Sequence, residues 1–168
     1  RRVRVAVRSG TGPPDGPDIT AIVISLNSRR FLRDCLDSLR GAEWRGVTHE
    51  VIVVDNGSTD GSQEIVRREH PSVRLIANEA NLGFCKASNQ GAAAARGRYF
   101  LFLNDDILIL GDALARLVEF MDAHPEAGLI GSRLLNPDGT DQFSSGRRFP
   151  TPANALFGDS IRGRGPQT

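Results

Sequence analysis

Short apolar runs alternate along the chain with segments whose apolar residues recur at every third or fourth position. Residues 19–24 form an almost continuous apolar run rich in branched side chains, which is typical of a parallel strand buried on both faces. A helix capped by Asn27 or Ser28 and ended by Gly41 is predicted next, because four apolar residues recur there at helical spacing: Leu32, Cys35, Leu36 and Leu39. The basic unit is therefore a strand followed by a helix.

This unit of strand and helix repeats along the chain. The further predicted elements are a strand over residues 50–54, a polar helix capped by Ser58 or Thr59 and running to Glu69, a strand over 72–77, a small-residue helix over 84–96, a strand over 98–103, a helix ended near His124 and a strand over 127–135. One face of the small-residue helix allows close packing of its backbone, since it consists of Ala87, Gly91, Ala94 and Ala95.

The alternation of strands and helices predicts an α/β fold. Its sheet is mostly parallel, with right-handed crossovers and helices on both faces. In such sheets ligands bind beyond the carboxyl ends of the strands. The polar residues that directly follow the predicted strands are therefore the candidates for a binding site: residues 25–27, 55–60 and 104–106.

The two ends of the chain differ from its middle. Residues 10–17 hold three glycines and three prolines, so we expect a basic, Pro- and Gly-containing linker over residues 1–18. A single domain over residues 19–150 follows. The last residues, 151–168, are rich in Gly and Arg without periodicity, and we expect a disordered or truncated tail there and a sheet that is incomplete at its C-terminal side.

Composition and charge narrow the functional classes. Lys and Arg number 21 against 20 Asp and Glu, giving a net charge of +1, so a broad positive field for nucleic acid is absent and we expect no nucleic-acid partner. The two cysteines, Cys35 and Cys85, are too far apart for a CxxC metal site, and we interpret them as reduced thiols in the cytoplasm. The longest apolar stretch, residues 99–110, is interrupted by acidic residues and cannot cross a bilayer, which takes about 20 apolar residues.

Four familiar enzyme classes lack their motifs in this chain. The turn after the first strand contains no glycine, which excludes the GxGxxG of a Rossmann dehydrogenase and the Gly-rich loop of a sugar nucleotidyltransferase. No GxxxxGK[ST] sequence is present for a P-loop enzyme. Acyl hydrolysis has no GxSxG nucleophile.

Asp105 and Asp106 directly follow the most apolar predicted strand. Two adjacent carboxylates at the mouth of a buried strand repel each other, and a divalent cation would offset that cost. Mg2+ and Mn2+ prefer such oxygen ligands and take the remainder from water and substrate phosphates. The alternative is that the two aspartates only end the strand in solvent.

Two further segments carry candidate ligand-binding residues. Asp55 ends another strand, where its carboxylate could accept a hydrogen bond from a base or a ribose hydroxyl; alternatively it closes an Asx-turn into the next helix. Gly83 enters a helix whose free amides could face an anion, and Lys86 in the first turn could reach a phosphate. The alternative for Lys86 is a solvated charge.

Together these stretches resemble the family 2 glycosyltransferases with the GT-A fold, a Rossmann-like nucleotide-diphospho-sugar transferase fold, and especially the rhamnosyltransferase-like branch that builds bacterial surface polysaccharides. The likeness spans about residues 19 to 150. It rests on four motifs that occur in the same order and spacing: residues 19–28, residues 53–61, residues 81–84 with Asn89, and residues 97–106.

The resemblance implies a metal-assisted transfer of a hexose that inverts the configuration of the sugar. Ser25, Leu26 and Asn27 would line the nucleotide and Asp55 would hold the base. Asn81 and Gly83 would border the sugar diphosphate, with Lys86 beside them. Residues 104–106 resemble the family's DxD signature with Asn in first place, so Asp106 would bind Mn2+ or Mg2+ and Asp105 would contact ribose or sugar.

The resemblance also implies partners and a location. The donor would be a nucleotide-diphospho-sugar and the acceptor a saccharide or a lipid-linked saccharide. We expect a cytoplasmic protein at the inner face of the membrane, with peripheral association through parts outside this chain. In the family an acidic general base follows all these motifs, and no second acidic motif follows them here. We therefore expect a C-terminally truncated donor-binding half with little or no transfer activity; the alternative is a nucleotide-sugar-binding remnant.

Overall fold

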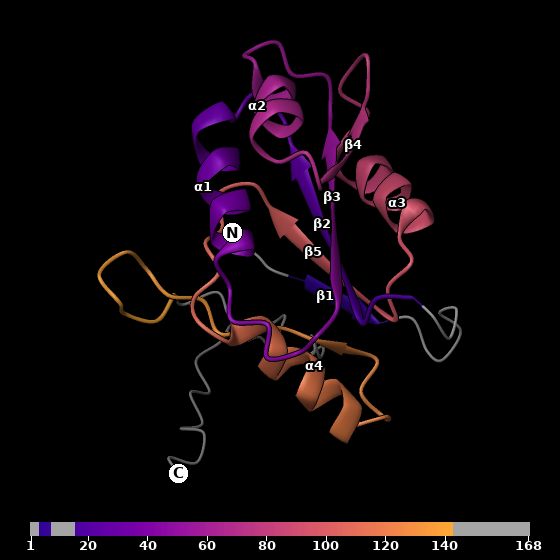
Figure 1. The fold of residues 1–168 in the computed structure, drawn as a ribbon, viewed down its shortest axis with the longest axis vertical. Coiled ribbons are helices and arrows are strands. Elements are labelled where there is room, and N and C mark those ends of the chain that lie inside the picture. Colours follow the sequence, from indigo (N-terminus) through magenta and orange to yellow (C-terminus); the bar gives the residue numbers. More distant parts are fainter. Residues whose placement is uncertain (1–3, 8–15, 143–168) are drawn as a thin grey trace, which may run out of the picture.

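The computed structural model describes residues 4–7 and 16–142 of the chain. They form a six-stranded sheet in the order β4-β3-β2-β5-β1-β6, with four helices (Figure 1). The elements are β1 (Arg4–Val7), β2 (Ile19–Ser25), α1 (Arg29–Arg40), β3 (His49–Asp55), α2 (Ser62–Glu69), β4 (Arg74–Ala77), α3 (Phe84–Ala94), β5 (Tyr99–Asn104), α4 (Ala113–Ala123) and β6 (Leu129–Ile130).

Strands β4, β3, β2 and β5 are parallel neighbours, as the alternation of strands and helices predicts. All seven residues of β2 are buried, which matches its nearly continuous apolar sequence. The registers pair Ser25 with Asp55 and Ile24 with Asn104. The carboxyl ends of β2, β3 and β5 therefore lie at one edge of the sheet.

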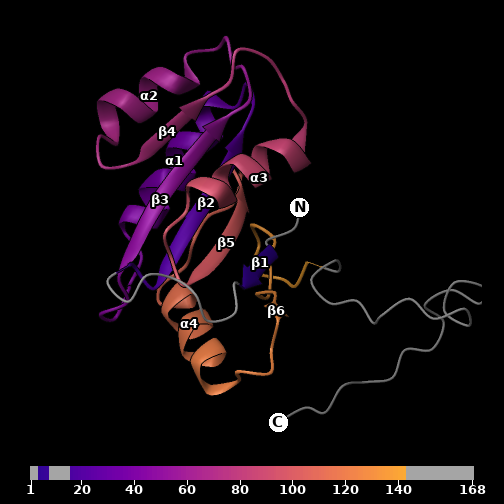
Figure 2. The same ribbon diagram turned by 90° about the vertical axis from the view of Figure 1, so that its right-hand side faces the viewer.

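Helices cover both faces of the sheet, as predicted (Figures 1 and 2). One core contains the inward residues of α1 and α4 with Val66 of α2, packed on side chains such as Val23 and Leu101. On the other face α3 lies close to β2 and β3, with Ala87 buried beside Ile22 and Val54. A Cβ atom on Gly91 would lie 2.3 Å from Ile22 Cγ2, so the small residues of α3 do permit close packing.

The structure differs from the sequence-based expectation near both ends of the described chain, in β1 and in β6. Residues 4–7, expected to belong to a linker over residues 1–18, form β1, which pairs antiparallel with β5 and β6. This pairing covers an edge of β5 that would otherwise be open. Residues 127–135 contain only the two-residue strand β6, and an isolated bridge joins Leu135 to Asp141. The expected tail over residues 151–168 lies outside the described residues.

One of the two predicted helix caps is wrong, and the other is confirmed in position only. Gly61 is the N-cap of α2, and Ser58 and Thr59 do not cap that helix. Their polar groups instead bond Asn27: the Asn27 amide donates to Ser58 Oγ at 2.8 Å, and the Thr59 amide donates to Asn27 Oδ1 at 2.9 Å. Ser28 is the N-cap of α1 but makes no side-chain cap bond. The bonds of Asn27 to Ser58 and Thr59 therefore join the loop before α1 to the loop before α2.

Two further findings concern the cysteines and the lengths of the helices in the described residues. Cys35 and Cys85 are both free thiols, the first buried and the second exposed. In the part of the chain that the structure describes, every helix is too short or too polar to span a membrane.

Candidate functional site

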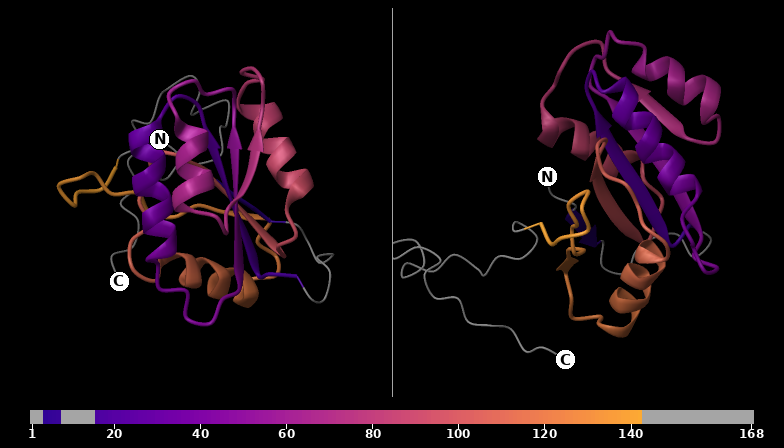
Figure 3. Two further views of the ribbon diagram at one scale, coloured as in Figure 1. Left: turned by 45° about the horizontal axis from the view of Figure 1, so that its top comes forward. Right: turned by 90° about the vertical axis from the view of Figure 1, so that its left-hand side faces the viewer.

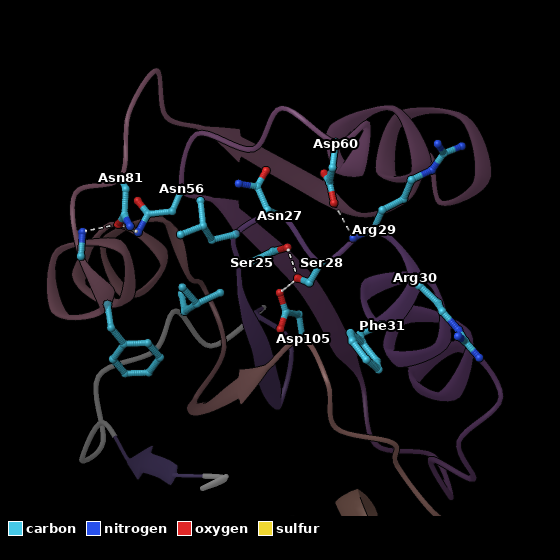
Figure 4. Close-up of a pocket in the computed structure, with 14 residues that line it drawn as sticks. Ser25, Asn27, Ser28, Arg29, Arg30, Phe31, Asn56, Asp60, Asn81 and Asp105 are labelled. Atoms are coloured by element: carbon cyan, nitrogen blue, oxygen red, sulfur yellow. Dashed lines mark hydrogen bonds between the residues drawn. The ribbon is translucent and has the colours of Figure 1, made fainter.

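A cavity of about 760 Å³ opens at the carboxyl ends of β2, β3 and β5 (Figure 4). Its size lies within the range of small-molecule sites. It is bordered by the loop between β2 and α1, the residues after β3, the loop before α3 and the end of β5. The lining residues are Ile24, Ser25, Leu26, Asn27, Ser28, Arg29, Arg30, Phe31, Asn56, Asp60, Asn81, Gly83, Phe84 and Asp105.

Three polar side chains meet at the centre of the cavity. Ser28 Oγ donates a hydrogen bond to Asp105 Oδ2, and it lies 3.3 Å from Ser25 Oγ (Figure 4). Ser28 is thereby drawn away from the amides at the start of α1 and toward the end of β5. The cluster joins two loops that are far apart in sequence, and it presents a carboxylate and hydroxyls to a ligand.

A network of amide side chains builds the opposite wall. Asn56 Nδ2 donates to Asn81 Oδ1 at 2.9 Å, and Asn81 Oδ1 also accepts the Gly83 amide at 2.9 Å. Asn56 Oδ1 accepts the amide of Leu82 and the side chain of Asn78, each at 3.1 Å. These bonds fix the loop before α3 against the end of β3 without using any charged group.

The charges of the site lie in separate places. Arg29 and Arg30 are exposed at the rim, at the N-terminus of α1 where free amides also carry partial positive charge. Asp105 supplies negative charge at the centre. Burial, followed by the charges of Asp105 and Asp106, raises the pKa of the Cys35 thiol to about 12, so this thiol beneath the site is protonated at neutral pH.

Six of the residues selected from sequence line the cavity: Ser25, Leu26, Asn27, Asn81, Gly83 and Asp105. Asp55 does not. It is fully buried, and its Oδ2 accepts the Ser58 amide at 2.9 Å and Gln63 Nε2 at 2.7 Å. The Ser58 amide lies three residues after Asp55, so this bond closes a local turn, as in the alternative that the sequence left open, while Asp55 Oδ1 is buried without a hydrogen-bond partner among the described residues. Successive residues of a strand point to opposite sides, and here Asn56 rather than Asp55 reaches the cavity.

Asp106 and Lys86 also lie outside this cavity. Asp106 borders a neighbouring, largely apolar cavity of about 820 Å³ between the start of α4 and residues 132–142. Lys86 is exposed on the first turn of α3 and does not line either cavity. The adjacent positions 105 and 106 thus place one carboxylate beside each cavity.

Other lining residues were not selected from sequence. Phe31 and Phe84 are about half exposed, at 54% and 51%. Phe31 falls outside the apolar stripe of α1 and so stands out as an aromatic residue facing away from the core. Asn56 and Asp60 lie in the polar stretch that follows β3 and that the sequence selected, but the sequence could not tell which of its side chains line the cavity.

The fold and this cavity define an α/β protein with a ligand site at the carboxyl ends of its parallel strands, and comparison with known proteins specifies the family. Residues 20–166 match the family model described as Glycosyl transferase family 2. The chain therefore belongs to this family, as the resemblance in its motifs implied.

Two curated relatives show similar matches. The succinoglycan biosynthesis protein ExoO of Rhizobium meliloti strain 1021 is 40% identical over 108 residues, which cover 64% of this chain and 30% of ExoO. A PGL/p-HBAD biosynthesis glycosyltransferase of Mycobacterium tuberculosis strain H37Rv is 35% identical over 118 residues, covering 68% of this chain and 45% of that protein. The chain thus spans less than half of the length of either relative.

Solved structures confirm the GT-A type of α/β fold. Staphylococcus aureus TarS has a TM-score of 0.58 and 29% identity, over 64% of this chain and 20% of the TarS chain. The mannosyltransferase PcManGT of Pyrobaculum calidifontis, solved in complex with GDP-Man and Mn2+, has a TM-score of 0.59 and 28% identity, over 67% of this chain and 34% of its own. A TarS fragment has also been solved in complex with UDP-GlcNAc.

Proposed function

We propose that this chain is the donor-binding part of a bacterial glycosyltransferase and that its cavity binds a nucleotide-diphospho-sugar. One observation carries the proposal: the loop after β2, the loop before α3 and Asp105 after β5 surround a single cavity at the carboxyl ends of the strands. The complexes of PcManGT with GDP-Man and of TarS with UDP-GlcNAc support a donor of this class.

Each wall of the cavity suits one part of such a donor. The uncharged polar groups of Ser25 and Asn27 are suited to hydrogen bonds with the nucleoside, and Asp105 can accept hydrogen bonds from ribose or sugar hydroxyls. Asn81 and Gly83 border the position proposed for the sugar diphosphate. The buried carboxylate of Asp55 holds the turn that carries Ser58, and so supports this wall from behind.

Mn2+ or Mg2+ fits the residues at the end of β5. Asp105 borders the donor cavity and Asp106 borders the neighbouring cavity, so we propose that the cation lies where these two cavities meet. In residues 4–7 and 16–142 no group of three or more His, Cys, Asp or Glu side chains could hold a metal ion. Mg2+ typically binds one or two protein carboxylates and takes further ligands from substrate phosphates. When bound, such a cation would neutralise charge that develops on the departing nucleoside diphosphate. We propose Asp106 as its main protein ligand.

The transfer itself is proposed to invert the configuration of the sugar. This requires a general base that takes the proton of the acceptor hydroxyl. The relatives extend well beyond the part that this chain matches. We propose that the base and the acceptor site lie in that further region, and that the present chain alone transfers sugar slowly or not at all.

The acceptor is proposed to be a saccharide or a lipid-linked saccharide at the inner face of the cytoplasmic membrane. Support comes from the names of the relatives, which include a succinoglycan biosynthesis protein. A bacterial surface polysaccharide is the corresponding product class. Transfer of labelled sugar into such a polymer by this chain joined to the further region of a relative, and not by this chain alone, would agree with the proposal.

Calorimetric titration of the chain with UDP, dTDP and GDP in the presence of Mn2+ tests donor binding. At least one of them should bind, and Asp105→Asn should weaken that binding about tenfold or more, because a hydrogen bond to a charged group contributes about 1.5–3 kcal/mol. Asp34→Asn is the matched control, since Asp34 is exposed and lies outside the cavity. Absence of binding for all three nucleotides, or equal affinity in Asp105→Asn, would contradict the proposal.

A further inference from the structure

The carboxylate of Asp60 joins the starts of two helices. Its Oδ2 accepts the backbone amide of Arg29, the first residue of α1, at 2.8 Å (Figure 4). Its Oδ1 accepts the amide of Ser62, the first residue of α2, at 3.0 Å, and the Ser62 hydroxyl at 2.5 Å. First-turn amides lack partners within their own helix, so one side chain satisfies a free donor on each.

The loop that precedes α1 is held in an unfavourable backbone conformation. Asn27 has a φ of 48°, in the left-handed region that few residues other than glycine adopt. Two bonds from the loop after β3 hold it there, those that join Asn27 to Ser58 and to Thr59. Together with the Asp60 bond to Arg29, three contacts join the β2–α1 loop to the β3–α2 loop.

Both oxygens of Asp60 are engaged by these protein donors, although the residue borders the cavity. Burial acts to raise the pKa of Asp60, but the Ser62 hydroxyl and the amides of Arg29 and Ser62 outweigh it, so the pKa of this carboxyl is lowered. The charged form is therefore the one that the two helix starts stabilise. A carboxylate occupied in this way acts on the ligand through the loops that it fixes.

We propose that Asp60 is a positioning residue for donor binding: by bonding the starts of α1 and α2 at once, it keeps the β2–α1 loop in the shape that a nucleoside diphosphate needs. The inference rests on the proposed function. Ser25, Asn27 and Ser28 lie on this loop and line the cavity. Without the Asp60 bond, the loop would have to be ordered at the moment of binding, and that ordering reduces affinity.

The variant Asp60→Ser separates positioning from simple helix capping. A serine hydroxyl at position 60 can still accept the Ser62 amide in a local turn, but it cannot bond Arg29 at the same time. Asp112→Ser is the matched control, because Asp112 is the N-cap of α4 and lies away from this cavity. The two variants and the original chain are compared by calorimetry with UDP, dTDP and GDP in Mn2+, and by amide hydrogen exchange without nucleotide.

We expect Asp60→Ser to remain folded, to bind the best nucleotide at least tenfold more weakly, and to exchange the amides of residues 27–29 at least tenfold faster in the absence of nucleotide. Asp112→Ser should change neither affinity nor exchange there. Weaker binding with unchanged exchange would mean direct contact with the ligand and would overturn the positioning role, as would unchanged affinity. Failure of the original chain to bind any nucleotide would instead overturn the proposed function.

Discussion

Gly97 is packed against the backbone of β2 with no room for a side chain. A Cβ atom there would lie 2.5 Å from the Thr20 amide nitrogen and 2.7 Å from the Ile19 carbonyl carbon. Its own amide donates to Thr20 Oγ1 at 2.8 Å in a buried position. The approach of the segment after α3 to β2 thus depends on a single residue type.

Gly97→Ala should lower the free energy of unfolding by about 1–3 kcal/mol, the usual range for overpacking, because backbone atoms must shift to admit the methyl group. Urea unfolding of the variant measures this. Gly128→Ala is the control, since nothing lies within 4 Å of a Cβ there. Equal free energies of unfolding for the two variants would contradict the close packing of Gly97 against β2.

At the scale of single residues, sequence identified the stretches that border the cavity better than the side chains that line it. The polar residues after β2, β3 and β5 were selected because they follow apolar strands, and all three stretches border the cavity. Within them, Asp55 is buried and accepts the Ser58 amide, whereas Asn56 reaches the cavity. A step of one residue at a strand end reverses the direction of a side chain, and sequence spacing does not resolve such a step.

Glu50 ties β3 to β2 and to the segment after α3. Its Oε1 accepts the Thr20 hydroxyl at 2.7 Å and the Arg96 amide at 2.6 Å, while Oε2 accepts the Arg96 guanidinium at 3.0 and 3.1 Å. Burial acts to raise the pKa of Glu50, but the bonds from Thr20 and Arg96 outweigh it, so the pKa of this carboxyl lies below its ordinary value.

This lowered pKa gives the stability a defined pH dependence. The contribution of Glu50 is fully present above pH 4.5, the value of the unfolded chain, and is lost as the pH falls through the lower pKa of the folded state. In Glu50→Gln the unfolding free energy should therefore be lower at pH 7 and should fall less steeply below pH 4.5. Urea unfolding between pH 7 and pH 3 measures both; parallel pH profiles would contradict the role of Glu50.

At the scale of elements, the central strands and the helices were predictable because their burial follows local patterns. The apolar run of β2 and the helical spacing in α1 match the structure closely. Strand β1 was not predictable, because residues 4–7 join the sheet only by pairing with β5 and β6, which lie far along the chain. The short β6 likewise depends on β1 rather than on its own sequence.

At the scale of the whole molecule, the loops that border the cavity lie together at the carboxyl ends of the parallel strands, and helices cover the two faces of the sheet (Figure 3). The covalent neighbours Asp105 and Asp106 separate this cavity from the apolar one beside α4. Family membership could be inferred from four ordered motifs, since their spacing is set by the fold. The roles of single binding residues could not be inferred, because they depend on how loops that are remote in sequence bond to each other.

Hydrogen exchange of the chain with and without its best nucleoside diphosphate and Mn2+ tests the central claim most directly. The account predicts slower exchange on binding in residues 25–31 and 104–106, with residues 132–142 beside the second cavity unchanged. Protection confined to residues 132–142, or no change in any segment at saturating nucleotide, would contradict it.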